Sequence, residues 1–190
     1  LLIITAVSAL FIASPVLQQF VVFPQTDFFT ELSLFGPYNN ATYPSNVTAG
    51  ENYRLYLNIN NHLGSCSYYV IEMKFRNQSQ SAPDSFNHTS SDLPSLGNIT
   101  FFVADKKSLQ LPIDVSFQYI IDANLPGKLY MKNITLNGVA LNVNSITIAW
   151  NPEKKGFYGN LFFELWIYND ATNVVQYHQR YVSLWLKMNP

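Results

Sequence analysis

Short segments in which apolar and polar residues alternate run through the chain from about residue 28 onward, separated by turn-forming residues. In the clearest segment Tyr53, Leu55, Leu57 and Ile59 alternate with the residues between them. This period of two predicts strands buried on one face, and the regular turn spacing is typical of a β-sandwich. No long amphipathic helix and no internal repeat is apparent. The predicted strands are 30–35, 53–59, 68–75, 99–103, 109–121, 128–135, 139–143, 146–150, 160–168 and 174–188.

Several polar or turn-rich segments modify this pattern. Residues 76–98 are rich in Ser, Asp and Pro, which predicts a long loop or edge excursion. Pro112 lies inside the predicted strand 109–121 and predicts an edge or a bulge, because proline has no N–H to donate. Asn137-Gly138 and the segment 169–173 predict hairpin turns.

The first thirteen residues form an uncharged, mainly apolar run that ends at Ser14-Pro15. A membrane span needs about 20 apolar residues, so a strand is favoured over an anchor, with a short buried helix as the alternative. A strand that is apolar on both faces requires burial on both faces, as when it inserts between two sheets. The residues expected to insert are Leu2, Ile3, Ile4, Val7, Leu10, Phe11 and Ile12.

The chain therefore divides into an amino-terminal donor strand with its connector, residues 1–23, and a β-sandwich domain, residues 24–190. Pro15 and Pro24 bracket the connector, and proline at both ends favours an extended chain. The predicted fold class is all-β: an immunoglobulin-like β-sandwich with an extended amino-terminal donor strand.

Six Asn-x-Ser/Thr sequons occur, about twice the number expected by chance. Four of them lie in polar, turn-rich stretches, where an acceptor asparagine is exposed to a bulky glycan. Glycans would also explain how a chain with 12% charged residues, against about 25% in typical domains, stays in solution. An extracellular location with N-linked glycans is therefore expected. The acceptor residues are Asn40, Asn46, Asn77, Asn87, Asn98 and Asn133.

The remaining chemistry is sparse. The net charge of -1, without a basic stripe, argues against nucleic acid as a partner. Cys66 is the only cysteine, which excludes an intrachain disulfide, and a half-buried strand cysteine is the favoured interpretation. The three histidines lie far apart in sequence, so no metal site is expected. No nucleophile elbow or phosphate-binding glycine loop occurs, so we expect neither catalysis nor a cofactor.

One carboxylate and several aromatic clusters are further candidates for a site. Glu164 lies among large apolar residues, and exposure or an ion pair on the outer face of a sheet is favoured over a buried carboxylate with a raised pKa. The aromatic clusters at 68–69, 101–102 and 150–158 are compatible with a sugar-binding platform, but core packing explains most of them.

A series of short motifs in a fixed order resembles an archaeal extracellular β-sandwich domain of unassigned function, over roughly residues 28 to 188. Its final hairpin is similar to 163–168 followed by 181–186 here. Joined to an apolar amino terminus, such a domain resembles the subunits of archaeal surface threads, in which each subunit's amino-terminal strand completes the neighbouring sandwich. The motifs are Thr30-Glu31, Leu34-Phe35-Gly36-Pro37, Tyr43-Pro44, Asn46-Val47-Thr48, Gly50-Glu51 and Asn61-His62.

The resemblance implies a structural subunit of an extracellular filament, with identical subunits as partners and contact with a membrane only during secretion. Donor-strand addition would join the subunits through backbone hydrogen bonds and buried apolar side chains. Two alternatives stay open. One is a type IV pilin-like subunit with a helical amino terminus. The other is a monomeric cell-surface adhesin or glycan-binding module whose amino terminus folds back into its own sandwich.

Overall fold

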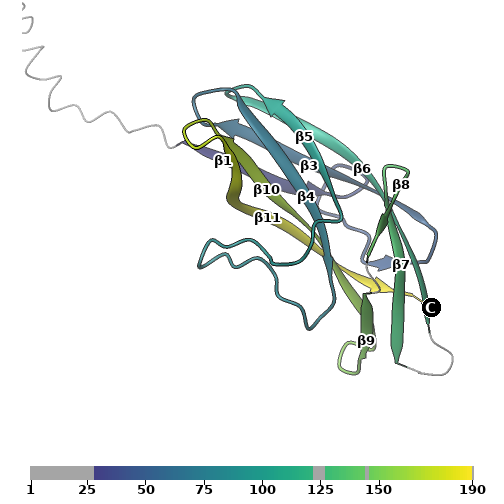
Figure 1. The fold of residues 1–190 in the computed structure, drawn as a ribbon. Coiled ribbons are helices and arrows are strands. Elements are labelled where there is room, and N and C mark those ends of the chain that lie inside the picture. The colour runs from purple at the N-terminus through teal and green to yellow at the C-terminus, as the bar shows by residue number, and fades with distance from the viewer. Residues whose placement is uncertain (1–27, 122–126, 144–145, 190) are drawn as a thin grey trace, which may run out of the picture.

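The computed structural model describes residues 28–121, 127–143 and 146–189. All the regular secondary structure in these ranges is β-strand (Figure 1). This confirms the all-β prediction, whereas the immunoglobulin-like topology stays a prediction. The strands are β1 (Phe29–Phe35), β2 (Asn46–Val47), β3 (Asn52–His62), β4 (Ser67–Arg76), β5 (Gly97–Val103), β6 (Lys107–Ile121), β7 (Lys128–Leu136), β8 (Val139–Asn142), β9 (Thr147–Asn151), β10 (Gly156–Asn169) and β11 (Val174–Met188).

The strands form two layers that are joined at one end. The first layer has the order β1-β3-β6-β7, with β8 also paired to β7, and all of its pairs are antiparallel. The second has the order β5-β4-β10-β11, with β2 added in parallel at the end of β11. The short strand β9 pairs with both β7 and β10, so the hydrogen bonding continues from one layer to the other. The result is a curled, sandwich-like sheet.

The hydrophobic core lies between the layers and follows the predicted alternation. Leu55, Leu57 and Ile59 of β3 are fully buried, while the residues between them are half-buried. Each such aliphatic side chain contributes about 1.5 to 3 kcal/mol on burial, an upper estimate because the unfolded chain already buries some apolar surface. Gly159 of β10 is required for this packing, because a Cβ there would lie 2.2 Å from Cζ of Phe75.

The predicted excursion after β4 covers part of the outer face of the second layer. Beneath it the carboxylate of Glu164 is completely buried and forms an ion pair with Lys74, with Nζ 2.8 Å from Oε2. The backbone N–H of Ser91, from the excursion, donates to Oε1 of Glu164 at 2.7 Å, and Lys74 donates to the Ser91 carbonyl at 2.9 Å. The expected ion pair on the outer face is thus present, but the carboxylate is buried because the excursion excludes solvent.

Two further sequence predictions have clear outcomes. Pro112 pairs with Tyr56 on one side only, since the pairing of β6 with β7 begins at Val115, so the predicted edge position is confirmed.

The prediction for Cys66 is wrong: this residue is a free, exposed cysteine in the turn before β4, because the strand begins one residue later.

The buried pair predicts an asymmetric mutational response. Lys74→Met should lower the free energy of unfolding by about 3–5 kcal/mol, because it leaves the Glu164 carboxylate buried without its cation. The double variant Lys74→Met/Glu164→Leu should recover much of that loss, because no buried charge remains. Urea denaturation of the three proteins measures both effects. Equal stability of the single and double variants would contradict this account of the buried ion pair.

Candidate binding groove between strands β1 and β11

Two neighbouring strands, one from each layer, present backbone edges that lack a strand partner over most of their length. Among the described residues, β1 pairs with β3 on one side only. The strand β11 pairs with β10 along its length, but β2 meets its other edge only at Lys187 and Met188. The two edges approach one another, and we call the space between them the β1–β11 groove.

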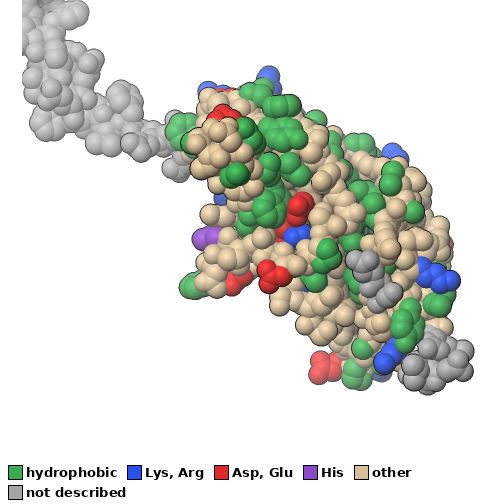
Figure 2. All heavy atoms as spheres, in the orientation of Figure 1, with side chains coloured by type: hydrophobic (Ala, Val, Ile, Leu, Met, Phe, Trp, Pro, Cys, Tyr) green, Lys and Arg blue, Asp and Glu red, His purple; other side chains and the backbone are tan. Residues whose placement is uncertain are grey.

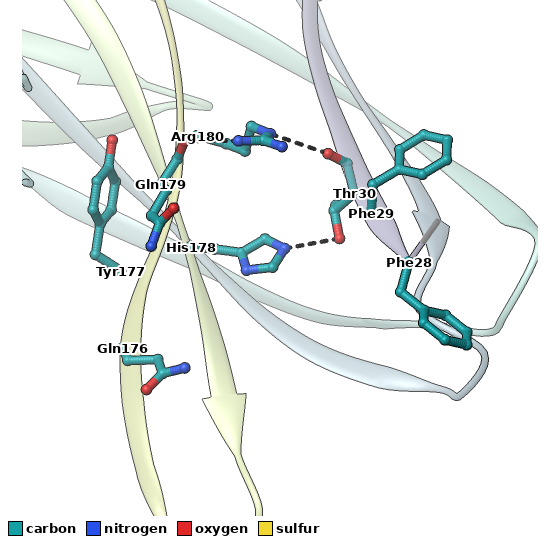
Figure 3. Close-up of a pocket in the computed structure, with 8 residues that line it drawn as sticks. All are labelled: Phe28, Phe29, Thr30, Gln176, Tyr177, His178, Gln179 and Arg180. Atoms are coloured by element: carbon teal, nitrogen blue, oxygen red, sulfur yellow. Dashed lines mark hydrogen bonds between the residues drawn. The ribbon is translucent and has the colours of Figure 1, made fainter. Parts of the chain in front are cut away.

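A bulge in β11 places side chains in contact with β1 across this groove. Two consecutive residues, His178 and Gln179, have no counterpart in β10, because Leu165 pairs with Arg180 and Trp166 with Tyr177. Gln179 takes a left-handed conformation with a φ of 56°, which a non-glycine residue adopts at some energetic cost. The bulge turns the His178 side chain toward β1 (Figure 3).

Side chains, and not backbone pairs, bridge the groove at the bulge. Nε2 of His178 lies 2.9 Å from the hydroxyl oxygen of Thr30, which in turn lies 3.0 Å from the hydroxyl of Tyr69. Nε of Arg180 donates to the Thr30 carbonyl at 3.4 Å, so Thr30 of β1 is hydrogen-bonded to two side chains of β11 (Figure 3). A cavity of about 220 Å³ opens beside these contacts, lined by Phe28, Phe29, Thr30 and 176–180.

Below the bulge the groove is lined by apolar residues. Leu32 of β1 and Val182 and Leu184 of β11 pack against the core, yet they are only partly buried. Their partners on the neighbouring strands, such as Ile59 opposite Leu32 and Leu161 opposite Leu184, are fully buried. Apolar residues that point toward a core and remain partly exposed on two adjacent open edges indicate room for a further strand.

Burial makes the histidine of the groove sensitive to pH. Desolvation lowers the pKa of His178, and the positive charge of Arg180 lowers it further. The imidazole is therefore neutral in the folded protein at neutral pH, which suits its hydrogen bond to Thr30. Protonation would place a second positive charge next to Arg180 inside the groove.

The structure brings together residues that sequence analysis did not single out as a site. His178 was considered only as a metal ligand, and Thr30 only as part of a motif. The signal in the sequence is the polar run 176–180, which interrupts an otherwise apolar strand at 174–188. The predicted donor residues Leu2, Ile3, Ile4, Val7, Leu10, Phe11 and Ile12 lie outside the described residues.

Four of the six sequon asparagines have exposed side chains. Asn40 lies in the loop after β1, Asn46 begins β2, and Asn87 lies in the excursion. Asn98 lies on β5, an edge strand that pairs only with β4 among the described strands. Each of these four asparagines is therefore accessible to a glycosylating enzyme.

The other two sequon asparagines are half-buried. Nδ2 of Asn77 donates to the Thr147 carbonyl at 2.9 Å, and its Oδ1 accepts hydrogen bonds from Ser79 and Gln80. Asn133 lies inside the first layer, on β7 between β6 and β8, where its Oδ1 is buried. Both positions are therefore less accessible to a glycosylating enzyme.

The described part of the chain offers few other chemical features. No group of three or more metal-ligating side chains occurs in it. None of its segments forms a helix with the length and hydropathy needed to cross a bilayer. The aromatic cluster at 150–158 contributes a packed pair, Trp150 against Phe157, with ring centroids 5.2 Å apart.

No protein-family model and no curated protein matches the chain. Similar solved structures include β-glucosidase from Listeria innocua in complex with isofagomine, at 10% identity and a TM-score of 0.40 over 87% of this chain and 17% of that chain. Another is β-D-glucoside glucohydrolase from Trichoderma reesei, at 10% identity and a TM-score of 0.33 over 88% of this chain and 19% of that chain. The chain thus spans less than a fifth of these enzymes, and similarity this distant carries no argument about activity.

The lowered pKa of His178 predicts that acid weakens the fold at the groove. An unfolded histidine has a pKa of about 6.5, so below this pH the unfolded state binds more protons than the folded state. The free energy of unfolding should therefore decrease as the pH falls from about 7.5 to about 5. His178→Gln, which keeps a hydrogen-bonding side chain, should flatten this part of the profile. An unchanged slope in denaturation curves of the variant would contradict the assignment.

Exposure predicts which sequons carry glycans. In native material Asn40, Asn46, Asn87 and Asn98 should be occupied more fully than Asn77 and Asn133, because the latter two are half-buried. Glycopeptide mass spectrometry measures the occupancy of each site. Full occupancy of Asn133 with little sugar on the four exposed sites would contradict the prediction.

Proposed function

We propose that this protein is a structural subunit of an extracellular surface filament of the archaeal thread type, and that it polymerises head to tail by donating its amino-terminal strand to the next subunit. The observation that carries the proposal is the β1–β11 groove, in which two open strand edges flank partly exposed apolar residues. Such a groove accepts an extended segment through backbone hydrogen bonds along the edge and through apolar side chains in the space below.

The groove has the dimensions of a short strand. Six residues of β11, 181–186, have an edge that no described strand pairs with, between the bulge and the pairing with β2. Six residues of strand span about 20 Å, which the apolar run 1–13 exceeds. That run is apolar on both faces, as required of a strand that lies between two layers.

Donation to a neighbour explains why the contact would propagate. A donor at one end of the chain and a groove in the body form a heterologous contact, which does not close on itself and builds a fibre. The connector 16–23, without glycine and with proline on either side, favours extension away from the body. The six sequons support a location outside the cell, and identical subunits are the partners that this arrangement requires.

Substitutions in the groove should separate assembly from folding. Val182→Asp places an unpaired charge in the groove, which costs about 3 kcal/mol or more when solvent is excluded and weakens the joint roughly 100-fold. Ser183→Asp is the matched control, because its side chain is exposed on the opposite face of β11. Sedimentation and electron microscopy of both variants measure filament yield, and near-ultraviolet circular dichroism checks their fold. Equal filament yields would exclude this groove as the acceptor.

A mixing experiment distinguishes donation to a neighbour from folding back. Deletion of 1–13 leaves a groove without a donor, and Val182→Asp leaves a donor without a groove. Neither variant should polymerise alone, but an equimolar mixture should form a heterodimer that cannot extend, detectable by mass in solution. A wild-type protein that remains monomeric, together with a mixture that forms no heterodimer, would favour the self-complemented adhesin.

A further inference from the structure

The outer face of the second layer carries an exposed aromatic patch next to a sequon. Tyr68 of β4 pairs with Phe102 of β5, and its ring contacts that of Tyr168, which follows the last β10 residue paired with β4. A second row crosses the same strands through Thr100, Val70 and Trp166. Figure 2 shows hydrophobic side chains gathered over this region, beside the charged side chains of the second layer. We call these two rows the aromatic patch.

The rings of the patch pack against one another but remain open to solvent. Ring centroids of Tyr68 and Phe102 lie 4.9 Å apart, and those of Tyr68 and Tyr168 lie 6.4 Å apart in an edge-to-face arrangement. Phe102 nevertheless remains 70% exposed and Tyr168 36% exposed. Contiguous exposed aromatic surface of this kind marks a site that something else covers.

A sequon supplies a covalently attached candidate on the same face. Asn98 lies two and four residues before Thr100 and Phe102 on β5, and residues two apart on a strand share a face. Asn98 pairs with Glu72, in the row next to that of Val70 and Thr100, so its side chain lies at the border of the patch. Its side chain is exposed, as are those of Thr100 and Phe102.

We propose that the glycan on Asn98 lies back over the aromatic patch and shields it, so that this sequon serves the protein's own surface and not only its solubility. The inference rests on the extracellular glycosylation included in the proposed function, but not on the polymerisation. Pyranose rings carry C–H groups on their faces, and these are attracted to the electron-rich faces of aromatic rings. The other half of the outer face is already covered by the excursion 77–96, which buries Glu164.

Placement distinguishes Asn98 from the other exposed sequons. Asn40, Asn46 and Asn87 lie in loops or in the two-residue strand β2, and none of them shares the outer face of β5 with these rings. Asn40 is therefore a matched control: it is an exposed sequon in a loop, and its removal changes glycan content without uncovering the patch.

The test compares glycoproteins that lack one sequon each. Asn98→Gln should increase the binding of the hydrophobic dye anilinonaphthalene sulfonate several-fold and lower Tm by roughly 2–4 °C, as expected for the loss of a contact of moderate strength. Asn40→Gln should change neither. Thr100→Ser keeps the sequon and should behave like the wild type.

A coupling measurement identifies the ring that the sugar contacts. Tyr68→Ala should lower Tm more in the glycosylated protein than in the Asn98→Gln background. In that background the glycan is already absent, so the substitution of Tyr68 removes no contact with it. Equal Tm losses in the two backgrounds would overturn the proposal. The same conclusion follows if Asn40→Gln matches Asn98→Gln in both measurements.

Two other outcomes would also overturn it, and they are distinguishable from failure of the proposed function. Glycopeptide analysis that finds Asn98 empty while Asn40 and Asn87 are occupied removes the shield but leaves an extracellular glycoprotein. Dye binding that disappears on filament formation, and does not change in Asn98→Gln, assigns the patch to a subunit contact. If all the sequons are empty, the glycosylation on which both proposals draw fails, whereas the polymerisation tests above remain valid.

Discussion

Backbone hydrogen bonding is the constraint on which the rest of this structure depends, because a strand edge left unpaired beside a hydrophobic core attracts another strand. The curled sheet satisfies this constraint where β9 joins the two layers at one end. It does not do so between β1 and β11, where Thr30, His178 and Arg180 join the layers through side chains. The open edges beneath these contacts are the basis of the proposed assembly.

The bulge of β11 explains why β1 and β11, as far as the described residues go, do not pair directly with each other. Two additional residues at 178–179 turn the strand and replace a backbone ladder with a histidine and an arginine. Bulges commonly redirect side chains, and this one turns His178 toward β1 while the pairing of β11 with β10 continues on either side. The polar contacts keep the two edges at a defined separation, which would favour the entry of an extended segment over collapse of the groove.

The outer face of the second layer must be kept in solution although the chain has few charged residues. One half is covered by the excursion after β4, held down by the buried pair of Lys74 and Glu164. The other half exposes aromatic rings in a protein with only 12% charged residues. A sugar chain anchored on the same face would cover apolar surface that the polypeptide leaves open, which makes glycosylation part of the surface packing and not only a modification of loops.

Strand periodicity and sequon chemistry are local, so the strands, the residues that alternate toward the core and the positions of the sequons could be predicted from the sequence. Only the fold shows which described edges lack a strand partner, that Glu164 is buried and that Tyr68 lies beside Phe102 on the face of Asn98. These outcomes depend on pairing between segments that are far apart along the chain, such as Thr30 with His178. A period of two says which residues share a face, but not which strand or loop will cover that face.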